Sequence, residues 1–188
     1  MTVGRLSVAV QLVVVVVCAL FFFVLSRSVR LTQVRLWAMA WWANALALTA
    51  VFVLAFVSPP PIPVRLGLAL YAAGKTCYAL LMVAGTRHHL RPGVDVKLKV
   101  VPVAVVVTAW SVILGAFAPH LGFAQLGQSV MVAGLLGLGG VWVLRRPRHS
   151  RSRWLGAALL LEAATFAHYV PLLAPMMWGG RPFASYLS

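Results

Sequence analysis

The chain has 188 residues, of which 62% are hydrophobic and 10% charged, and its formal net charge is +14. With a mean hydropathy of +0.96, it lies outside the composition of soluble globular domains, and we expect a polytopic membrane protein. The sequence offers no soluble basic domain and no basic surface interleaved with aromatic residues, so nucleic acid is excluded as an expected partner.

Six windows of the sequence meet or approach the length that a membrane-spanning helix requires, which is about 20 mostly apolar residues for a hydrocarbon core of roughly 30 Å. We therefore expect an all-α fold in which residues 1–188 form a single integral-membrane domain, a polytopic bundle of six transmembrane helices. The windows are residues 6–26, 36–57, 64–85, 100–118, 121–144 and 154–176. The first is too long for the core of a secretory signal, and no small-x-small cleavage site follows it, so it is expected to be an uncleaved anchor.

Between these windows, the proline-rich segment SPPPIPVR (58–65) is expected to form a stiff, extended connector. His88 and His89 follow the third window beside basic residues, and a solvated loop is the expected setting for both. His120 and His168 form no ligand-spacing motif, so no haem, metal or other cofactor is expected.

Most of the 16 Lys and Arg residues fall in every second loop. They are Arg27, Arg30 and Arg35 in the first loop, Arg87, Arg91, Lys97 and Lys99 in the third, and Arg145, Arg146, Arg148, Arg151 and Arg153 in the fifth. The positive-inside rule makes these loops cytoplasmic and places both ends of the chain outside. The same residues attract anionic headgroups, so membrane lipid is an expected partner.

Two lone charges, Lys75 and Glu162, stand in the middle of the third and sixth windows. A charge near the bilayer centre costs about 2.5 to 3.5 kcal/mol on insertion scales, so both require an explanation. From the rise of about 1.5 Å per residue, Lys75 lies roughly 15 Å and Glu162 roughly 12 Å from the basic ends of their helices. Asn44 lies at roughly 12 Å on the second helix, which predicts one polar layer across three helices.

Helical spacing adds tyrosines to this layer, because residues at i, i+4 and i+7 share a face. The candidate residues are Lys75, Glu162, Asn44, Tyr71, Tyr78 and Tyr169. Two interpretations stay open: a site for an unidentified small ligand or a proton, or a structural ion pair of Lys75 and Glu162 that fixes the helix register.

Other polar and small residues are expected to join helices. Ala43 with Ala47, and the AGLLGLGG run at 133–140, predict close helix contacts, either within the bundle or across a homodimer face. Gln125 and Gln128 are expected to form hydrogen bonds between helices. Because the chain has only two acidic residues, it offers no paired carboxylates and no Ser-His-Asp set, and no enzymatic activity is expected within it.

The stretch 35–93, which includes RLWAMAWWANALALTAVFVLAF and LYAAGKTCYALLMVAGTRHHLRPG, resembles the N-terminal multi-span sensory region of bacterial diguanylate cyclases of the GGDEF family. The residues that carry the likeness are Gly74, Lys75, Tyr78, Gly85 and Arg87. The resemblance implies a signal-input module in a bacterial inner membrane. The printed sequence has no GGDEF or GGEEF motif, so the cyclase domain itself would follow a seventh span beyond Ser188.

Two alternatives remain beside the sensor. In one, the bundle is a small transporter or channel with Lys75 and Glu162 on a midplane path for a solute or a proton, although the sequence lacks the paired broken helices of many transporters. In the other, the bundle is a scaffold for partner helices, which predicts that both charges are replaceable by leucine.

Overall fold

The computed structural model describes residues 3–57, 61–91, 100–118, 121–145 and 150–178, and their regular secondary structure is entirely α-helical. The helices are α1 (Val3–Ser28), α2 (Thr32–Val57), α3 (Pro61–Leu90), α4 (Val100–Phe117), α5 (Leu121–Leu144) and α6 (Ser150–Trp178). Four of them are long and apolar enough to cross a membrane, over the stretches Leu6–Ser28, Thr32–Leu54, Val64–Leu90 and Gly122–Leu144. The protein is therefore an all-α bundle with several helices suited to a membrane, as the composition predicts.

The helices coincide with the six predicted windows, but two local expectations are wrong. The extended connector is contradicted at residues 61–65, because α3 already begins at Pro61; proline fits the first helical turn, where its missing N–H has no partner in any case. The loop expected at His88 and His89 is also contradicted, since both lie in the last turn of α3. The helix continues to Leu90 because the next proline is Pro92, and proline disfavours helix only in the residue directly before it.

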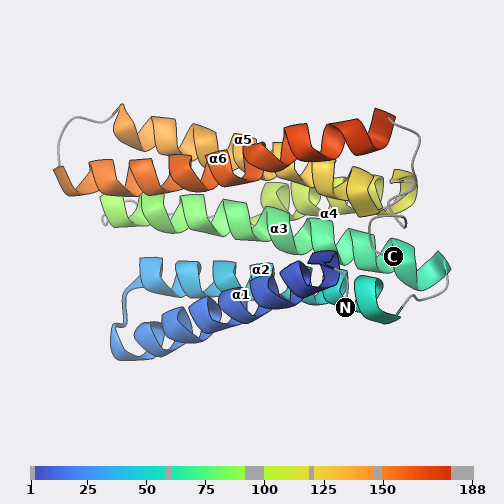
Figure 1. The fold of residues 1–188 in the computed structure, drawn as a ribbon. Coiled ribbons are helices and arrows are strands. Elements are labelled where there is room, and N and C mark those ends of the chain that lie inside the picture. The colour runs from blue at the N-terminus through green and yellow to red at the C-terminus, as the bar shows by residue number, and fades with distance from the viewer. Residues whose placement is uncertain (1–2, 58–60, 92–99, 119–120, 146–149, 179–188) are drawn as a thin grey trace.

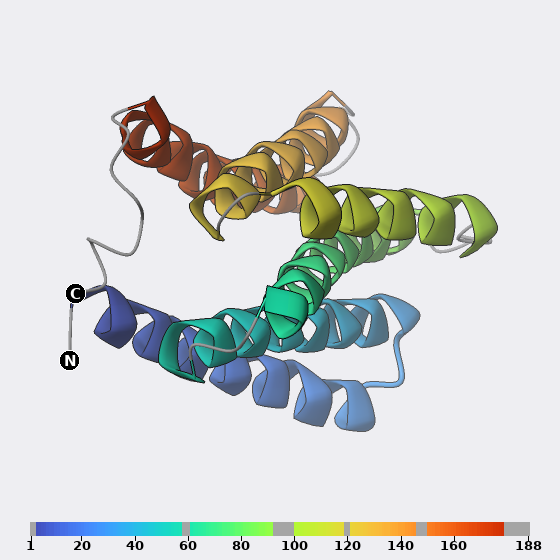
Figure 2. The same cartoon turned by 90° about the vertical axis from the view of Figure 1, so that its right-hand side faces the viewer.

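Two antiparallel hairpins flank a central helix (Figure 1). The helices α1 and α2 form one hairpin and α5 and α6 the other, and α3 packs against α2 on one side and α5 on the other. The helix α4 packs against α3 (Figure 2). The largest buried cluster includes Tyr78, Leu136, Val143 and Leu159, contributed by α3, α5 and α6.

Small residues bring α2 and α3 together. A Cβ atom at Gly74 would lie 2.6 Å from the carbonyl oxygen of Ala43 and 2.8 Å from the Cβ of Ala47. The close contact predicted at these two alanines is thus confirmed, and it lies within the bundle. In the 133–140 run, a Cβ at Gly139 would lie 2.8 Å from Val83 of α3, whereas a Cβ at Gly134 would have no neighbour within 4 Å.

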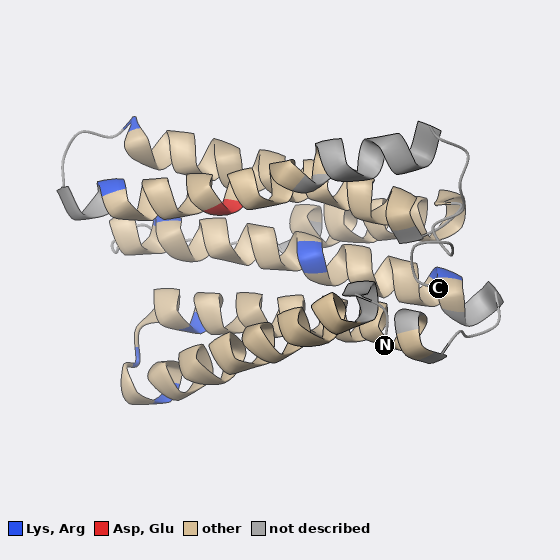
Figure 3. Ribbon diagram, in the orientation of Figure 1, with Lys and Arg blue, Asp and Glu red and all other residues tan. Residues whose placement is uncertain are grey.

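The arginines of the described residues gather mainly at one end of the bundle, where α1, α3 and α5 end and α2 and α6 begin (Figure 3). We call this the basic end; its residues are Arg27, Arg30, Arg35, Arg87, Arg91, Arg145 and Arg153. Large apolar side chains cover the outside of the helices, for example Val13 and Val24 of α1, which are 64% and 62% exposed. Apolar flanks with a charged end are the pattern of a bundle that contacts lipid along its length.

Candidate functional site

Lys75 lies at the centre of the candidate site, in the middle of α3. Its side chain is only 7% exposed, and its Nζ lies 5.0 Å from the centroid of the Phe166 ring of α6. The face of an aromatic ring attracts a cation, by about 2 kcal/mol or more where water is excluded. Phe166 therefore covers the ammonium group and offsets part of the cost of its burial.

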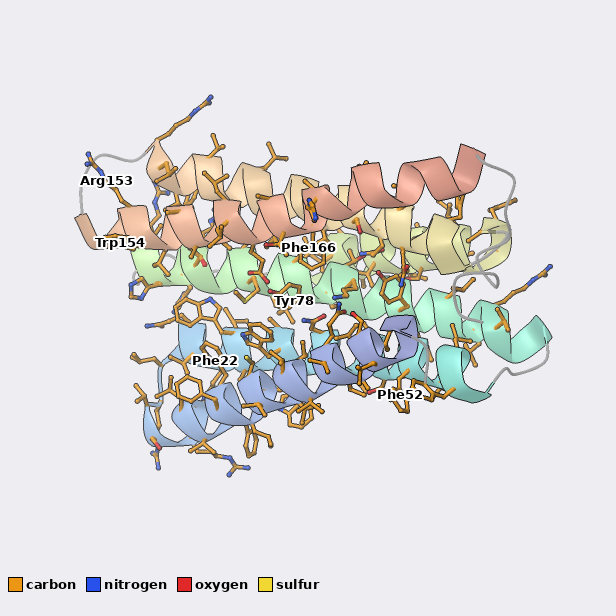
Figure 4. All side chains as sticks on the ribbon, in the orientation of Figure 1. Phe22, Phe52, Tyr78, Arg153, Trp154 and Phe166 are labelled. Carbon is orange, nitrogen blue, oxygen red and sulfur yellow. The ribbon has the colours of Figure 1, made fainter. Side chains whose placement is uncertain are left out.

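Glu162 is held by a tyrosine of the neighbouring helix. The hydroxyl of Tyr78 donates a hydrogen bond to the Oε1 of Glu162. Tyr78 is fully buried, and its ring packs edge-on against Trp41 of α2, with the centroids 5.6 Å apart. One side chain of α3 thus contacts two other helices, α2 through its ring and α6 through its hydroxyl. Tyr78 and Phe166 are labelled in Figure 4.

Within the described part of the chain, Lys75 and Glu162 form no direct ion pair. Each has its own partner, Phe166 for the ammonium and Tyr78 for the carboxylate, although the two charges are close enough to attract each other. The reason is a small offset in depth: Glu162 lies at the level of Tyr78, about one helical turn from Lys75 towards the basic end.

Asn44 lies at the level of Lys75 on the facing, antiparallel helix α2. Gly74 contacts both Ala43 and Ala47, so its level lies between them. One residue further along α3, towards the basic end, Lys75 reaches the level of Asn44. Asn44 is 4% exposed, and its Oδ1 is buried without a hydrogen-bond partner among the described residues, as is the Nε1 of Trp41. The Nε1 of Trp37 and the Nδ1 of His88 are also unpaired in the described part of the chain, and Asn44 is the member of this set that lies at the level of Lys75. Buried polar atoms are nearly always paired, so this side of α2 and α3 is unusual.

Tyr71 and Tyr169 are the other two predicted tyrosines. Tyr71 is buried against Ala47 and Val51 of α2 and Val8 of α1, so it shares the face of Lys75 but lies one turn further from the basic end. The side chain of Tyr169 lies outside the described residues. The structure therefore brings Lys75, Tyr78 and Glu162 together, with Asn44 at their level, and Tyr71 packs in a cluster with α1 and α2.

A second polar layer joins a different face of α3 to α4 and α5, because Thr76 lies about 100° around the helix from Lys75. The indole of Trp110 donates to Gln128 over 2.7 Å, Gln128 donates to Thr76 over 3.1 Å, and Thr76 donates to the carbonyl of Ala72 over 2.8 Å. The predicted interhelical hydrogen bonds of Gln128 are confirmed. Its partners were not foreseen, because Thr76 and Trp110 have no signal of their own beyond their place within apolar windows.

The two layers differ in how well their polar groups are paired. Each of the three donors in the Trp110–Gln128–Thr76 layer has an acceptor, which is the arrangement expected of a structural network. The layer around Lys75 and Asn44 contains a charge held by a ring and an acceptor with no partner. An unpaired buried group of this kind costs about 1–3 kcal/mol, so it calls for a functional explanation.

The described residues contain no cluster of three or more His, Cys, Asp or Glu side chains that could hold a metal ion. The two cysteines, Cys18 and Cys77, are half-buried free thiols. Comparisons with protein-family models, with curated proteins and with solved structures find no match to this chain.

Proposed function

We propose that this protein is a membrane-embedded signal-input module, and that the layer formed by Lys75, Glu162, Tyr78 and Asn44 is its input site. The observation that carries the proposal is the pair of buried groups with open hydrogen-bonding capacity, Lys75 and Asn44, beside a carboxylate held by another helix. Ionisable groups inside a membrane bundle favour a functional role over a structural one.

The chemistry of these groups defines the ligand class. The ammonium of Lys75 donates hydrogen bonds and favours negative charge, and the Oδ1 of Asn44 accepts one hydrogen bond. A small molecule with an anionic or carbonyl oxygen next to a hydroxyl or amine satisfies both groups at once. Such a ligand gains contacts here without breaking any hydrogen bond of the Gln128 layer.

Movement of α6 couples this site to an output. Phe166 covers the ammonium of Lys75, so a ligand that contacts this group displaces the ring and changes how α6 packs on α3. The helix α6 packs mainly on α5 and meets α3 through these side chains, and packed side chains switch between discrete arrangements. A ligand with different affinities for the two arrangements shifts their populations, which is the thermodynamic requirement for a sensor.

The proposal also includes six membrane spans, with the basic end on the cytoplasmic side of a bacterial inner membrane. The arginines at the basic end support this orientation through the positive-inside rule. The likeness of residues 35–93 to the sensory regions of diguanylate cyclases supports a cyclase domain as the output. The intact mass of the native gene product tests this part: a product much heavier than 20.3 kDa is expected, with a seventh span and an output domain after Ser188.

The input site is tested with Lys75→Met, which keeps the length of the side chain and removes its charge. The control is Leu161→Met, next to Glu162 but 72% exposed on the outside of α6. In cells that express the native gene product at matched levels, Lys75→Met is expected to fix the cyclic diguanylate concentration at one level across growth conditions, and Leu161→Met to respond like wild type.

Two other results decide for the alternatives. If purified protein in liposomes carries a proton or solute flux that Lys75→Met abolishes, the protein is a transporter and the sensor proposal fails. If the double variant Lys75→Leu with Glu162→Leu keeps full output and a folded bundle, the layer is not an input site and the scaffold alternative stands.

A further inference from the structure

A groove of 640 Å³ lies at the basic end of the α1–α2 hairpin, far from Lys75. Its volume falls in the range of small-molecule sites, about 300 to 1,000 Å³. Arg27 at the end of α1, Arg30 in the turn and Arg35 at the start of α2 line its polar part. Phe23, Met39 and Trp42 line its apolar part.

The polar part is a concentrated positive charge with no acidic partner in the groove. The three arginines are exposed, and the guanidinium of Arg27 lies 5.1 Å from the centroid of the Phe23 ring. Glu162 is the only acidic side chain among the described residues, and it lies midway along α6. Guanidinium groups bind phosphate oxygens with two parallel hydrogen bonds, so this cluster favours a phosphate.

The apolar part distinguishes a lipid from a soluble anion. Phe23, Met39 and Trp42 are 40%, 57% and 40% exposed, which leaves their side chains open to a ligand. Trp42 follows Arg35 by seven residues, roughly 10 Å along the helix axis. The groove therefore changes from charged to apolar over the distance that separates the headgroup level from the upper acyl chains, and an inorganic phosphate uses only its charged half.

We propose that this groove binds one anionic phospholipid from the leaflet at the basic end. The phosphate contacts Arg27, Arg30 and Arg35, and an acyl chain lies along Phe23, Met39 and Trp42. Basic pockets at the ends of transmembrane helices are suited to such headgroups. The site does not use Lys75 or Glu162, so it is independent of the input site proposed above.

Native mass spectrometry of the detergent-purified protein tests the charged half, with phosphatidylglycerol and phosphatidylcholine titrated separately. The groove variant is Arg27→Gln with Arg30→Gln and Arg35→Gln. The control removes the same charge from the same end outside the groove, through Arg87→Gln with Arg91→Gln and Arg145→Gln. Because only the groove variant loses charge-assisted hydrogen bonds to the phosphate, it is expected to bind phosphatidylglycerol roughly a hundredfold more weakly, while the control loses less than about fivefold.

Equal losses in the two variants would mean that the phosphatidylglycerol is held by the general surface potential, and the proposal would be wrong. Equal binding of phosphatidylcholine by the wild-type protein would also overturn it. A third arm adds inorganic phosphate at millimolar concentration: if it displaces the bound phosphatidylglycerol completely, the groove is an anion site and the acyl contacts contribute nothing.

The apolar half is tested without any change to the arginines. Brominated acyl chains quench nearby tryptophans, and the difference between wild type and Trp42→Phe isolates the signal of Trp42. In phosphatidylcholine nanodiscs, a small fraction of brominated phosphatidylglycerol is expected to quench Trp42 more strongly than the same fraction of brominated phosphatidylcholine. Equal quenching by the two lipids refutes a specific lipid at this position.

Discussion

The contact of Gly74 with α2 gives the sharpest test of the bundle. In Gly74→Ala the new Cβ would lie 2.6 Å from the carbonyl oxygen of Ala43 and 2.8 Å from the Cβ of Ala47. The first atom belongs to helix backbone and cannot rotate away, so α2 and α3 must separate by several tenths of an ångström. The matched control is Gly134→Ala in α5, where the Cβ would meet no atom within 4 Å.

The expected magnitude follows from two opposing effects. Overpacking of a close contact costs about 1–3 kcal/mol, and the replacement of a helical glycine by alanine returns up to about 1 kcal/mol. Gly74→Ala should therefore lower the free energy of unfolding by roughly 1–2 kcal/mol. Gly134→Ala receives only the favourable effect and should be neutral or slightly more stable.

Unfolding of the purified protein by titration with a denaturing detergent, followed by tryptophan fluorescence, measures both changes. The reasoning is refuted if Gly74→Ala is as stable as wild type, because α2 and α3 would then not be in close contact at this point. It is also refuted if both variants lose the same stability, since the effect would then come from the loss of glycine in a membrane helix and not from the contact.

Four further variants are measured in the same unfolding assay. Gln128→Leu leaves the indole of α4 without its acceptor and should lower the free energy of unfolding by about 1–3 kcal/mol. Asn44→Leu removes an acceptor that has no partner among the described residues and should leave the bundle as stable as wild type or more so. Equal losses at the two positions would contradict the difference between the layers. Tyr78→Phe keeps the ring on α2 but removes the hydrogen bond to α6, and should cost about 1.5–3 kcal/mol because the acceptor is charged. Leu161→Ala, at a position 72% exposed, should change stability by less than about 0.5 kcal/mol; a larger loss there would mean that α6 is covered on that side.

The sequence predicts the helices well because membrane helices are set by apolar length, a property that can be counted. All six windows correspond to observed helices. The ends were harder to predict: α2 begins at Thr32 and α3 continues to Leu90, both beyond the apolar stretches. A helix does not end where hydrophobicity ends, because polar residues such as His88 and His89 are compatible with helical backbone until a proline intervenes.

The sequence predicts the depth of the candidate residues in the membrane, but not which of their side chains contact one another. The rise per residue indicates that Lys75, Glu162 and Asn44 lie at similar levels. It does not indicate that Glu162 lies one turn from Lys75, beside Tyr78, because this offset depends on the register of α6 against α3. The helical wheel places Tyr71 on the face of Lys75, yet only the packing of α1 and α2 decides that Tyr71 is buried against them.

The two polar layers on different faces of α3 explain how one bundle combines a fixed frame with a responsive side. Gln128 of α5 accepts a hydrogen bond from Trp110 of α4 and donates one to Thr76 of α3. A shift of these helices would break both hydrogen bonds without replacing them. On the other face, the contact of Lys75 with Phe166 has no strict geometry, and the Oδ1 of Asn44 has no bond to lose. A polar ligand that enters on this face gains hydrogen bonds as α6 shifts, whereas on the Gln128 face it would first have to break existing ones. Since a ligand moves an equilibrium only by its difference in affinity between two states, the site of response is expected on the side where polar groups of the bundle are unpaired.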